Sequence, residues 1–272
     1  MLSHHKNNIQ LSLKLIALSS LFSLYSTAAF SLSSTSESSA AYSIKKQTVK
    51  TQAKQGDARA LYLIGKQYRD GKGVSRNLEK AFSLLSESAN KGFAPAQIDL
   101  GQMYTAGISI EQDYVKAFNW FKKAADQGYA SAQFNLANLY RTGRGTLVDA
   151  TKAHAYYLKA AENGFVKAQF NLAIMYLHGL GVVKDLTKVV YWYEQAANKG
   201  FPMAQYYLAQ MYVNGEGTEK DLTRALSWFT AASNAGVKEA FDAKRDLEVK
   251  IEQIAQSEET TSVLKSDFAL EN

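Results

Sequence analysis

The chain has 272 residues, of which 46% are hydrophobic and 12% aromatic, so it can bury a substantial core. It contains no cysteine, which excludes disulfides, thiolate zinc sites and a cysteine nucleophile. The formal net charge is +6, but the lysines and arginines form no basic block, which argues against a protein that binds nucleic acid.

The first 29 residues have the pattern of a secretory signal peptide. Lys6 and Lys14 precede an apolar run over residues 15–24, and Thr27 and Ala29 are the small residues expected before a cleavage site. An uncleaved membrane anchor is the alternative, but the run is shorter than the ~20 residues that span a bilayer. The chain has no N-x-S/T sequon, which together with the lack of cysteine favours a bacterial protein that is periplasmic or secreted. We therefore expect a signal peptide over residues 1–29 and no membrane span in the mature chain.

Two short segments follow the expected signal peptide. Residues 30–41 are rich in serine and are predicted to be a linker. Val49 and Ala53 match two positions of the second helix of the repeat described next, so residues 42–55 are predicted to form an N-terminal capping helix.

A 36-residue repeat accounts for most of the chain. Its marker is a glycine that recurs at this spacing, at Gly56, Gly92, Gly128, Gly164, Gly200 and Gly236. We number the positions of each unit from this glycine as zero. The five units are residues 56–91, 92–127, 128–163, 164–199 and 200–235. Such a period indicates a solenoid, because one unit cannot cover its own apolar face without its neighbours.

Each unit is predicted to contain two helices. Alanine at +4, leucine or isoleucine at +8 and tyrosine at +12 form an apolar stripe on helix A, which ends at a glycine at +15. A second glycine stands at +17 in four units, and Asn or Asp at +21 suits the N-cap of helix B. Helix B carries large residues at +28 and +29 and a small residue at +33. The pattern predicts an all-α solenoid of helix–turn–helix repeats.

The chain after Gly236 departs from the repeat. Glu248 replaces the tyrosine of position +12, and Ile251 replaces the glycine of position +15. Residues 236–256 are therefore predicted to form a C-terminal capping helix, with Leu247, Ile251 and Ile254 facing inward. Residues 257–272 are too polar to fold alone and are predicted to be a disordered tail.

The pattern A-x3-L-[GA]-x2-Y-x2-G-x-G-[VT]-x2-D resembles the Sel-one-like repeat family, a branch of the tetratricopeptide-like solenoids. The unit that fits best carries Ala168, Leu172, Ala173, Tyr176, Gly179, Gly181, Val182, Asp185, Trp192, Ala197 and Gly200. The resemblance implies a right-handed superhelical solenoid whose concave wall, lined by the A helices, holds peptides or partner proteins. Relatives act as adaptors in protein quality control, envelope assembly, signalling and infection of host cells. Some exported relatives have a disulfide in each repeat, which this chain lacks.

Candidate catalytic groups are sparse. The Gly-x-Gly loops lie between two helices rather than after a strand, so they do not indicate a dinucleotide site. His154 and His178 occupy unrelated repeat positions and predict no metal site, and His154 stands where other units have phenylalanine. The motif S-x-x-K begins at Ser43 and at Ser262, but S-D-N and K-T-G are absent. We expect no cofactor and no enzymatic activity. The alternative is a hydrolase of cell-wall or β-lactam substrates, since some cysteine-rich relatives are described as acting on β-lactams.

The candidate binding site is a row of side chains on the A helices. Positions +3, +7, +10 and +14 point away from the apolar stripe. The candidate groove residues are Asp99, Gln102, Asn135, Asn138, Arg141, Asn171, His178, Tyr207, Gln210 and Asn214. Asparagine and glutamine offer donors and acceptors, which suits an extended peptide backbone. Arg69 and Arg141 at +13 suit an acidic ligand and plain solvation equally.

The sequence thus predicts an exported scaffold that binds a protein or peptide in this groove, in host interaction or envelope assembly. An ordinary solvated helix face is the alternative for the row. A structural envelope spacer is a further alternative for the whole chain.

Overall fold

The computed structural model describes residues 47–270, with side chains described through residue 257. The expected signal peptide, the linker and residues 42–46 of the expected capping helix lie outside the described residues. Residues 47–54 form a helix. The helices that follow are α2 (Ala58–Asp70), α3 (Leu78–Asn90), α4 (Ala94–Ala106), α5 (Tyr114–Asp126), α6 (Ala130–Thr142), α7 (Ala150–Glu162), α8 (Val166–His178), α9 (Leu186–Asn198), α10 (Pro202–Asn214), α11 (Leu222–Asn234) and α12 (Lys238–Leu270).

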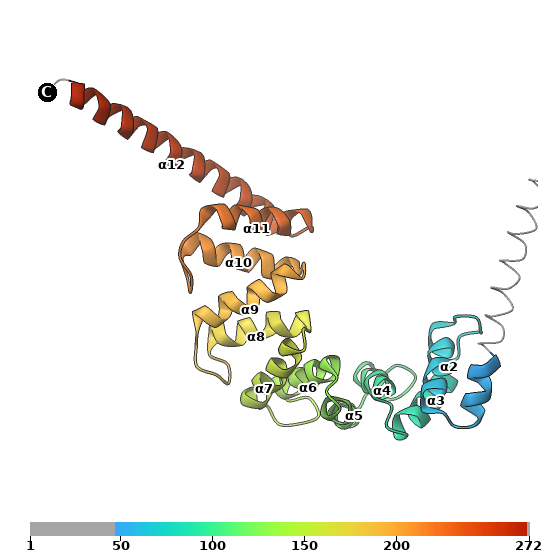
Figure 1. Ribbon diagram of the computed structural model, residues 1–272. Coiled ribbons are helices and arrows are strands. Elements are labelled where there is room, and N and C mark those ends of the chain that lie inside the picture. Colours follow the sequence, from blue (N-terminus) through green and yellow to red (C-terminus); the bar gives the residue numbers. More distant parts are fainter. Residues whose placement is uncertain (1–46, 271–272) are drawn as a thin grey trace, which may run out of the picture.

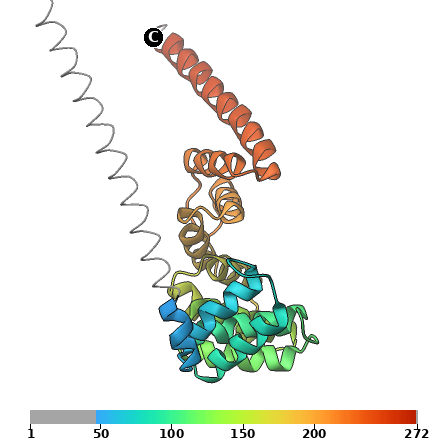
Figure 2. The same ribbon diagram turned by 90° about the vertical axis from the view of Figure 1, so that its right-hand side faces the viewer.

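The helices stack in consecutive pairs to form an open arc (Figure 1). Each helix packs mainly against the helix before it and the helix after it, as in other solenoids. The stack begins with α2 and α3 at one end, and α12 projects from the other end (Figures 1 and 2). Residues 47–270 contain no β-strand. These findings confirm the predicted all-α solenoid of 36-residue helix–turn–helix units, in which α2, α4, α6, α8 and α10 are the A helices.

The helix ends follow the repeat. The side chain at +21 caps every B helix by accepting a hydrogen bond from the backbone N–H three residues later, at 2.8 to 3.1 Å. Every A helix ends at the glycine at +15, whose φ lies between 66° and 72°. The expected N-caps and C-terminal glycines are therefore confirmed.

The second loop glycine, at +17 of the third to fifth units, lies where the loop packs closely against the backbone of the preceding unit. A Cβ on Gly145 would collide with the backbone carbonyl of Tyr114, and one on Gly181 would collide with that of Ala150. The second unit has Ser109 at this position, and its φ is 61°, in the left-handed region that disfavours side chains. The same left-handed conformation at +17 therefore occurs even where the residue is not glycine.

The core combines small residues on the A helices with large ones on the B helices. Alanine at +4 and leucine at +8 are buried in the second to fifth units, and the side chains at +29 are buried in all five. The ring of Phe121 fills the space beside Gly101, where a Cβ would have no room. Tyr157 and Tyr193 are among the largest fully buried side chains. Burial of these aromatic rings accounts for much of the hydrophobic stabilisation.

A buried glutamine at +5 was not anticipated from the sequence. Gln97, Gln169 and Gln205 each donate through Nε2 to the carbonyl oxygen at +33 of the preceding unit, at 3.1 to 3.2 Å. In the second unit the side chain at +35, Gln127, also donates to Oε1 of Gln97 at 2.8 Å. In the third unit Asn163 donates to Gln133 in the same way at 3.3 Å.

The last two units lack this second hydrogen bond. Lys199 and Ala235 stand at +35 there, and Oε1 of Gln169 and of Gln205 is buried without a hydrogen-bond partner. Nζ of Lys199 instead donates a hydrogen bond to the carbonyl oxygen of Gly164 at 2.9 Å. Alanine has no side-chain donor, so the residue at +35 of the last unit cannot satisfy Oε1 of Gln205.

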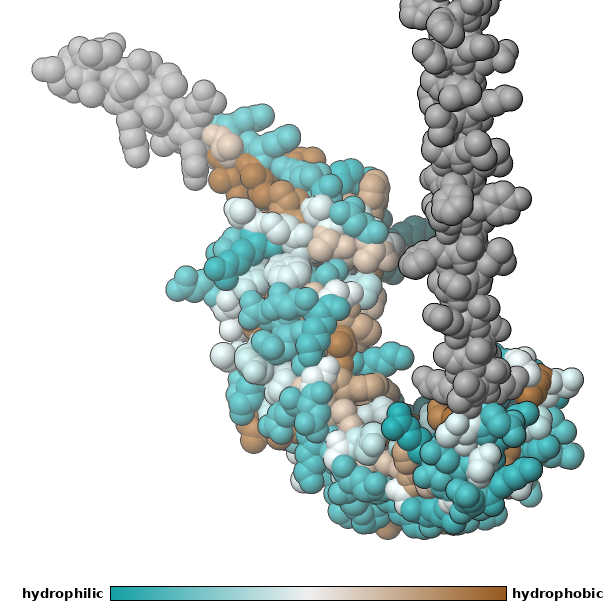
Figure 3. All heavy atoms as spheres, turned by 45° about the vertical axis from the view of Figure 1, so that its right-hand side comes forward, coloured by the Kyte–Doolittle hydropathy of each residue, from teal (hydrophilic) through white to brown (hydrophobic). Residues whose placement is uncertain are grey.

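The C-terminal helix is longer than predicted. The expected end at residue 256 and the disordered tail differ from the structure over residues 257–270, where α12 continues to Leu270 (Figure 1). The last two residues of the predicted tail lie outside the described residues. The segment contains no Gly or Pro after Lys238, so nothing in it stops a helix once the solenoid has nucleated one. Leu247 is buried and Ile251 packs against the core as expected, but Ile254 is exposed because α12 has left the solenoid at that point. Figure 3 shows the resulting hydrophobic surface on the described part of α12.

Candidate functional site

The candidate residues lie on the A helices, and six of them line two depressions. The first depression lies between α4 and α6 and has a volume of about 340 Å³. It is lined by Gln102, Thr105, Tyr114, Phe121, Asn135, Asn138, Leu139, Arg141, Thr142 and Arg144. We call it the central depression. The structure therefore brings together the candidates Gln102, Asn135, Asn138 and Arg141 from the second and third units.

The amides of the central depression differ in how they are held. Asn138 is fixed, because its Nδ2 donates to the carbonyl of Phe134 at 3.1 Å and its Oδ1 accepts from the Tyr157 hydroxyl at 2.6 Å. Gln102 and Asn135 have no hydrogen-bond partner among the described residues. Their donors and acceptors are open to a ligand.

The Tyr157 hydroxyl lies beneath the row of candidates. Burial raises the pKa of Tyr157, and the nearby Arg141 and Asn171 act in the opposite direction. The hydroxyl thus keeps its proton at neutral pH and donates it to Asn138. This one buried group links candidates on α6 and on α8.

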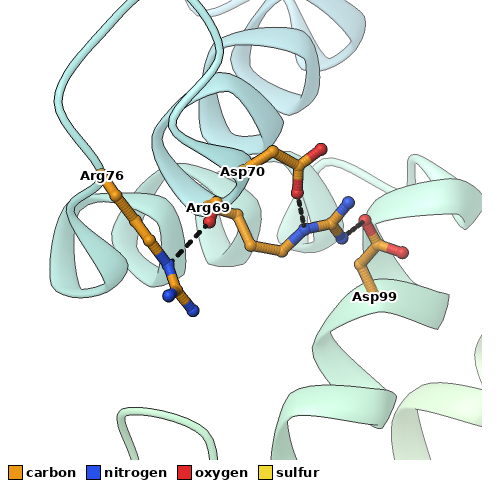
Figure 4. Close-up of polar contacts among 4 residues, drawn as sticks. All are labelled: Arg69, Asp70, Arg76 and Asp99. Carbon is orange, nitrogen blue, oxygen red and sulfur yellow. Dashed lines mark hydrogen bonds and ion pairs between the residues drawn. The ribbon is translucent and has the colours of Figure 1, made fainter.

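Asp99 is paired within the fold (Figure 4). Arg69 donates through Nη1 to Oδ2 of Asp99 at 2.5 Å and through Nε to Oδ1 of Asp70 at 2.8 Å. Its carbonyl oxygen accepts from Nε of Arg76 at 3.2 Å. Burial raises the pKa of Asp99, and the Arg69 guanidinium offsets part of that rise. The pair joins α2 to α4, so Asp99 and Arg69 contribute to the junction between two units.

The second depression lies among α10, α11 and α12 and has a volume of about 390 Å³. Its lining includes the candidates Gln210 and Asn214 with Val213, Phe229, Ala243, Asp246, Leu247 and Lys250. Both amides are engaged within the chain, because Gln210 donates to the Tyr206 hydroxyl at 2.8 Å and Asn214 donates to Glu216 at 3.0 Å.

Four candidates line neither depression: Asp99, described above, Asn171, which lies near the Tyr157 hydroxyl, Tyr207 and His178. Tyr207 stacks on Tyr193, with ring centroids 5.7 Å apart and an interplanar angle of 17°, and so serves packing. His178 is exposed at the end of α8 and lines neither depression.

A family model of the Sel1 repeat matches residues 58–93, 94–129, 130–165, 166–201 and 202–237 in succession. The chain belongs to the Sel1 repeat family. The resemblance found in the repeat residues is thereby confirmed. Sel1 repeats form scaffolds that generally bind other proteins.

Solved structures show the same fold. A protective antigen of uropathogenic Escherichia coli strains, described as having an SLR fold, is 34% identical with a TM-score of 0.69, over 71% of this chain and 41% of the antigen chain. The present chain therefore matches less than half of the antigen's length. A Sel1 repeat protein from Oxalobacter formigenes is 35% identical with a TM-score of 0.64, over 70% of this chain and 76% of that chain. No curated protein matches the chain.

Sequence reasoning missed part of the lining of the central depression. Arg144 stands at +16, in the Sel1 loop between the two glycines, and its guanidinium lies 5.3 Å from the centroid of the Tyr114 ring. Position +16 holds Lys72, Ile108, Arg144, Leu180 and Glu216 in the five units. This variation was visible in the sequence and marks the loop as a place where the units differ.

The half-buried His154 serves packing, as its repeat position predicted. His154 meets the edge of Tyr176 of the next Sel1 unit at 5.2 Å, as Phe82 meets Tyr104 and Phe118 meets Tyr140. Its Nε2 is buried without a hydrogen-bond partner, and burial lowers the pKa of the ring.

Two features are absent from the described residues. In residues 47–257 no three side chains of His, Cys, Asp or Glu are grouped to hold a metal ion. None of the helices within the described residues has the length and apolar character needed to span a bilayer.

Proposed function

We propose that this Sel1 repeat protein is an exported adaptor that binds an extended segment of a partner protein across the central depression. The observation that carries the proposal is the pair of unpartnered amides, Gln102 and Asn135, in a depression formed by two neighbouring units. An amide side chain pairs with both the N–H and the C=O of a peptide, so two amides on adjacent helices suit an extended backbone.

The floor of the depression supports the same proposal. Asn138 is held by Tyr157 and by its own helix, so its position is set before a ligand arrives. A site that needs little ordering loses little free energy on binding. The rigid floor and the two free amides together form a partly preorganised surface for a peptide.

Export rests on the signal-peptide pattern of residues 1–29 and on the likeness to a bacterial antigen. A protective antigen of uropathogenic strains supports a role in host interaction for a relative that shares its fold. We therefore place the binding activity in the periplasm or outside the cell.

The experiment is site-specific photo-crosslinking in the source organism. A photoreactive amino acid is placed at Gln102 or at Asn135, and at Asn119 as the matched control, an exposed residue of helix B in the second unit. We expect protein adducts from the two depression positions and few from the control. Equal adducts from all three positions would disprove a specific surface, and the absence of adducts would favour an envelope spacer. Fractionation of the same cells tests the export.

A further inference from the structure

We infer that Arg141 receives a carboxylate of the bound segment, and this inference rests on the proposed function. It follows from comparing two equivalent places in the solenoid. Arg69 and Arg141 both stand at +13, in the last turn of helix A of the first and third units. The fold gives the first arginine acidic partners and gives the second none.

Arg69 shows which group fits at this place. It binds Asp99, which stands at +7 of the next unit, and Asp70, which stands at +14 of its own unit. The side chain of Asp99 is only 14% exposed, so the guanidinium attracts a carboxylate into a largely buried position (Figure 4). Guanidinium and carboxylate match in charge and in the geometry of their hydrogen bonds.

Both acidic partners are replaced by neutral residues around Arg141. The residue at +7 of the next unit is Asn171, and the residue at +14 of its own unit is Thr142. Arg141 forms no ion pair with any described residue and is exposed. Beside Arg69 the fold supplies the carboxylate of Asp99, whereas at the equivalent position beside Arg141 it supplies only the neutral side chain of Asn171.

The space beside Arg141 is open and positive. Besides facing Asn171 of the next unit, Arg141 lines the central depression on the side of α4 together with Arg144, and this lining contains no Asp or Glu. Asn171 and Arg141 both lie near the Tyr157 hydroxyl, and Asn138 accepts its hydrogen bond. A carboxylate that enters here meets two guanidinium groups and the donors of neighbouring amides. Its source is an Asp or Glu side chain or the C-terminus of the bound segment.

The test uses purified protein and synthetic octapeptide libraries. One library has random sequence and a free C-terminus, the second is the same library with an amidated C-terminus, and the third lacks Asp and Glu. Retained peptides are identified by mass spectrometry. We expect wild-type protein to enrich peptides that carry a carboxylate, by about tenfold, since a hydrogen bond to a charged group contributes this much. The amidated and acid-free libraries show whether the carboxylate is terminal or in a side chain.

Three variants locate the effect. Arg141→Gln removes the guanidinium from an exposed side chain, and Asn171→Asp supplies the internal carboxylate that Arg69 already has; both should abolish the enrichment. The matched control is the double variant Arg69→Gln with Asp99→Asn, which removes the internal ion pair and should leave the enrichment unchanged. Melting curves by circular dichroism establish that each variant is folded.

The outcomes separate this inference from the proposed function. If wild-type protein binds peptides without a preference for carboxylates, or if Arg141→Gln leaves the preference intact, the carboxylate assignment is wrong while peptide binding stands. If wild-type protein retains no peptide from any library, the proposed function itself fails. Loss of the preference in the Arg69 control as well as in Arg141→Gln would also overturn the assignment.

Discussion

Replacing Ala235 with glutamine is expected to stabilise the last repeat. Oε1 of Gln205 is buried there without a hydrogen-bond partner, because Ala235 at +35 has no donor. In the second unit the residue at +35 is Gln127, which donates to Gln97 at 2.8 Å. The backbone at the two positions is nearly the same, with φ −84° and ψ 3° at Ala235 and φ −86° and ψ 4° at Gln127. A glutamine at residue 235 can therefore reach Gln205 without a change in the backbone.

The expected gain follows from two opposing contributions. A buried acceptor without a partner costs about 1–3 kcal/mol, and the new hydrogen bond recovers this. Fixing an exposed glutamine side chain costs roughly 1 kcal/mol of rotamer entropy. We expect the free energy of unfolding of the last repeat to rise by about 1 kcal/mol.

The assay is amide hydrogen exchange of α10 and α11, because solenoid repeats can unfold locally and a global melt averages over them. The control is the same substitution in a Gln205→Leu background, since the first unit has Leu61 at position +5 and tolerates an apolar side chain there. The gain should vanish in that background. An equal gain in both backgrounds would refute the hydrogen-bond explanation, because the benefit would then come from the helix end alone.

Three further outcomes are expected. Burial lowers the pKa of His154 below its ordinary value of 6.5, so the unfolded chain binds the proton more readily than the folded chain. The contribution of neutral His154 to stability is therefore complete above pH 6.5 and declines as the pH falls below that value. His154→Phe should flatten the decline in melting temperature between about pH 7 and about pH 5, and an unchanged slope would assign it to other groups. Ser109→Gly should raise the free energy of unfolding by about 1 kcal/mol in urea titrations, because it relieves a φ of 61°; a loss would show that the side chain contributes to the loop. Gly145→Ala should lower the free energy of unfolding by more than about 1 kcal/mol, because the new Cβ would collide with the backbone of Tyr114. An unchanged free energy of unfolding would contradict the close packing of this loop on the preceding unit.

The backbone of the solenoid could be predicted because its causes are local and repeated. The glycine at +15 ends each A helix by its positive φ, and the residue at +21 begins each B helix by capping it. The length of α12 could not be predicted in this way. Residues 257–262 are all polar, and a helix continues through a stretch of such composition because the preceding turns are already held by the solenoid.

The candidate site was predicted less completely than the fold. The row on the A helices included Gln102, Asn135 and Arg141, which the structure brings into one depression. The sequence did not show that Asp99 is bound to Arg69, because the two are 30 residues apart and meet only when the units stack. Distances between side chains of different units depend on the superhelix, which a one-dimensional pattern does not contain.

The ion pair between Arg69 and Asp99 belongs to a junction rather than to a unit, and this has a consequence for modular evolution. If residues 92–127 were excised, Arg69 would face Asn135 at position +7 of its new neighbour; it would keep Asp70 but lose the carboxylate of Asp99. A duplication or a swap of whole units would likewise expose or neutralise a guanidinium without altering any residue. The order of the modules, as much as their content, thus determines which charges this protein offers to a partner.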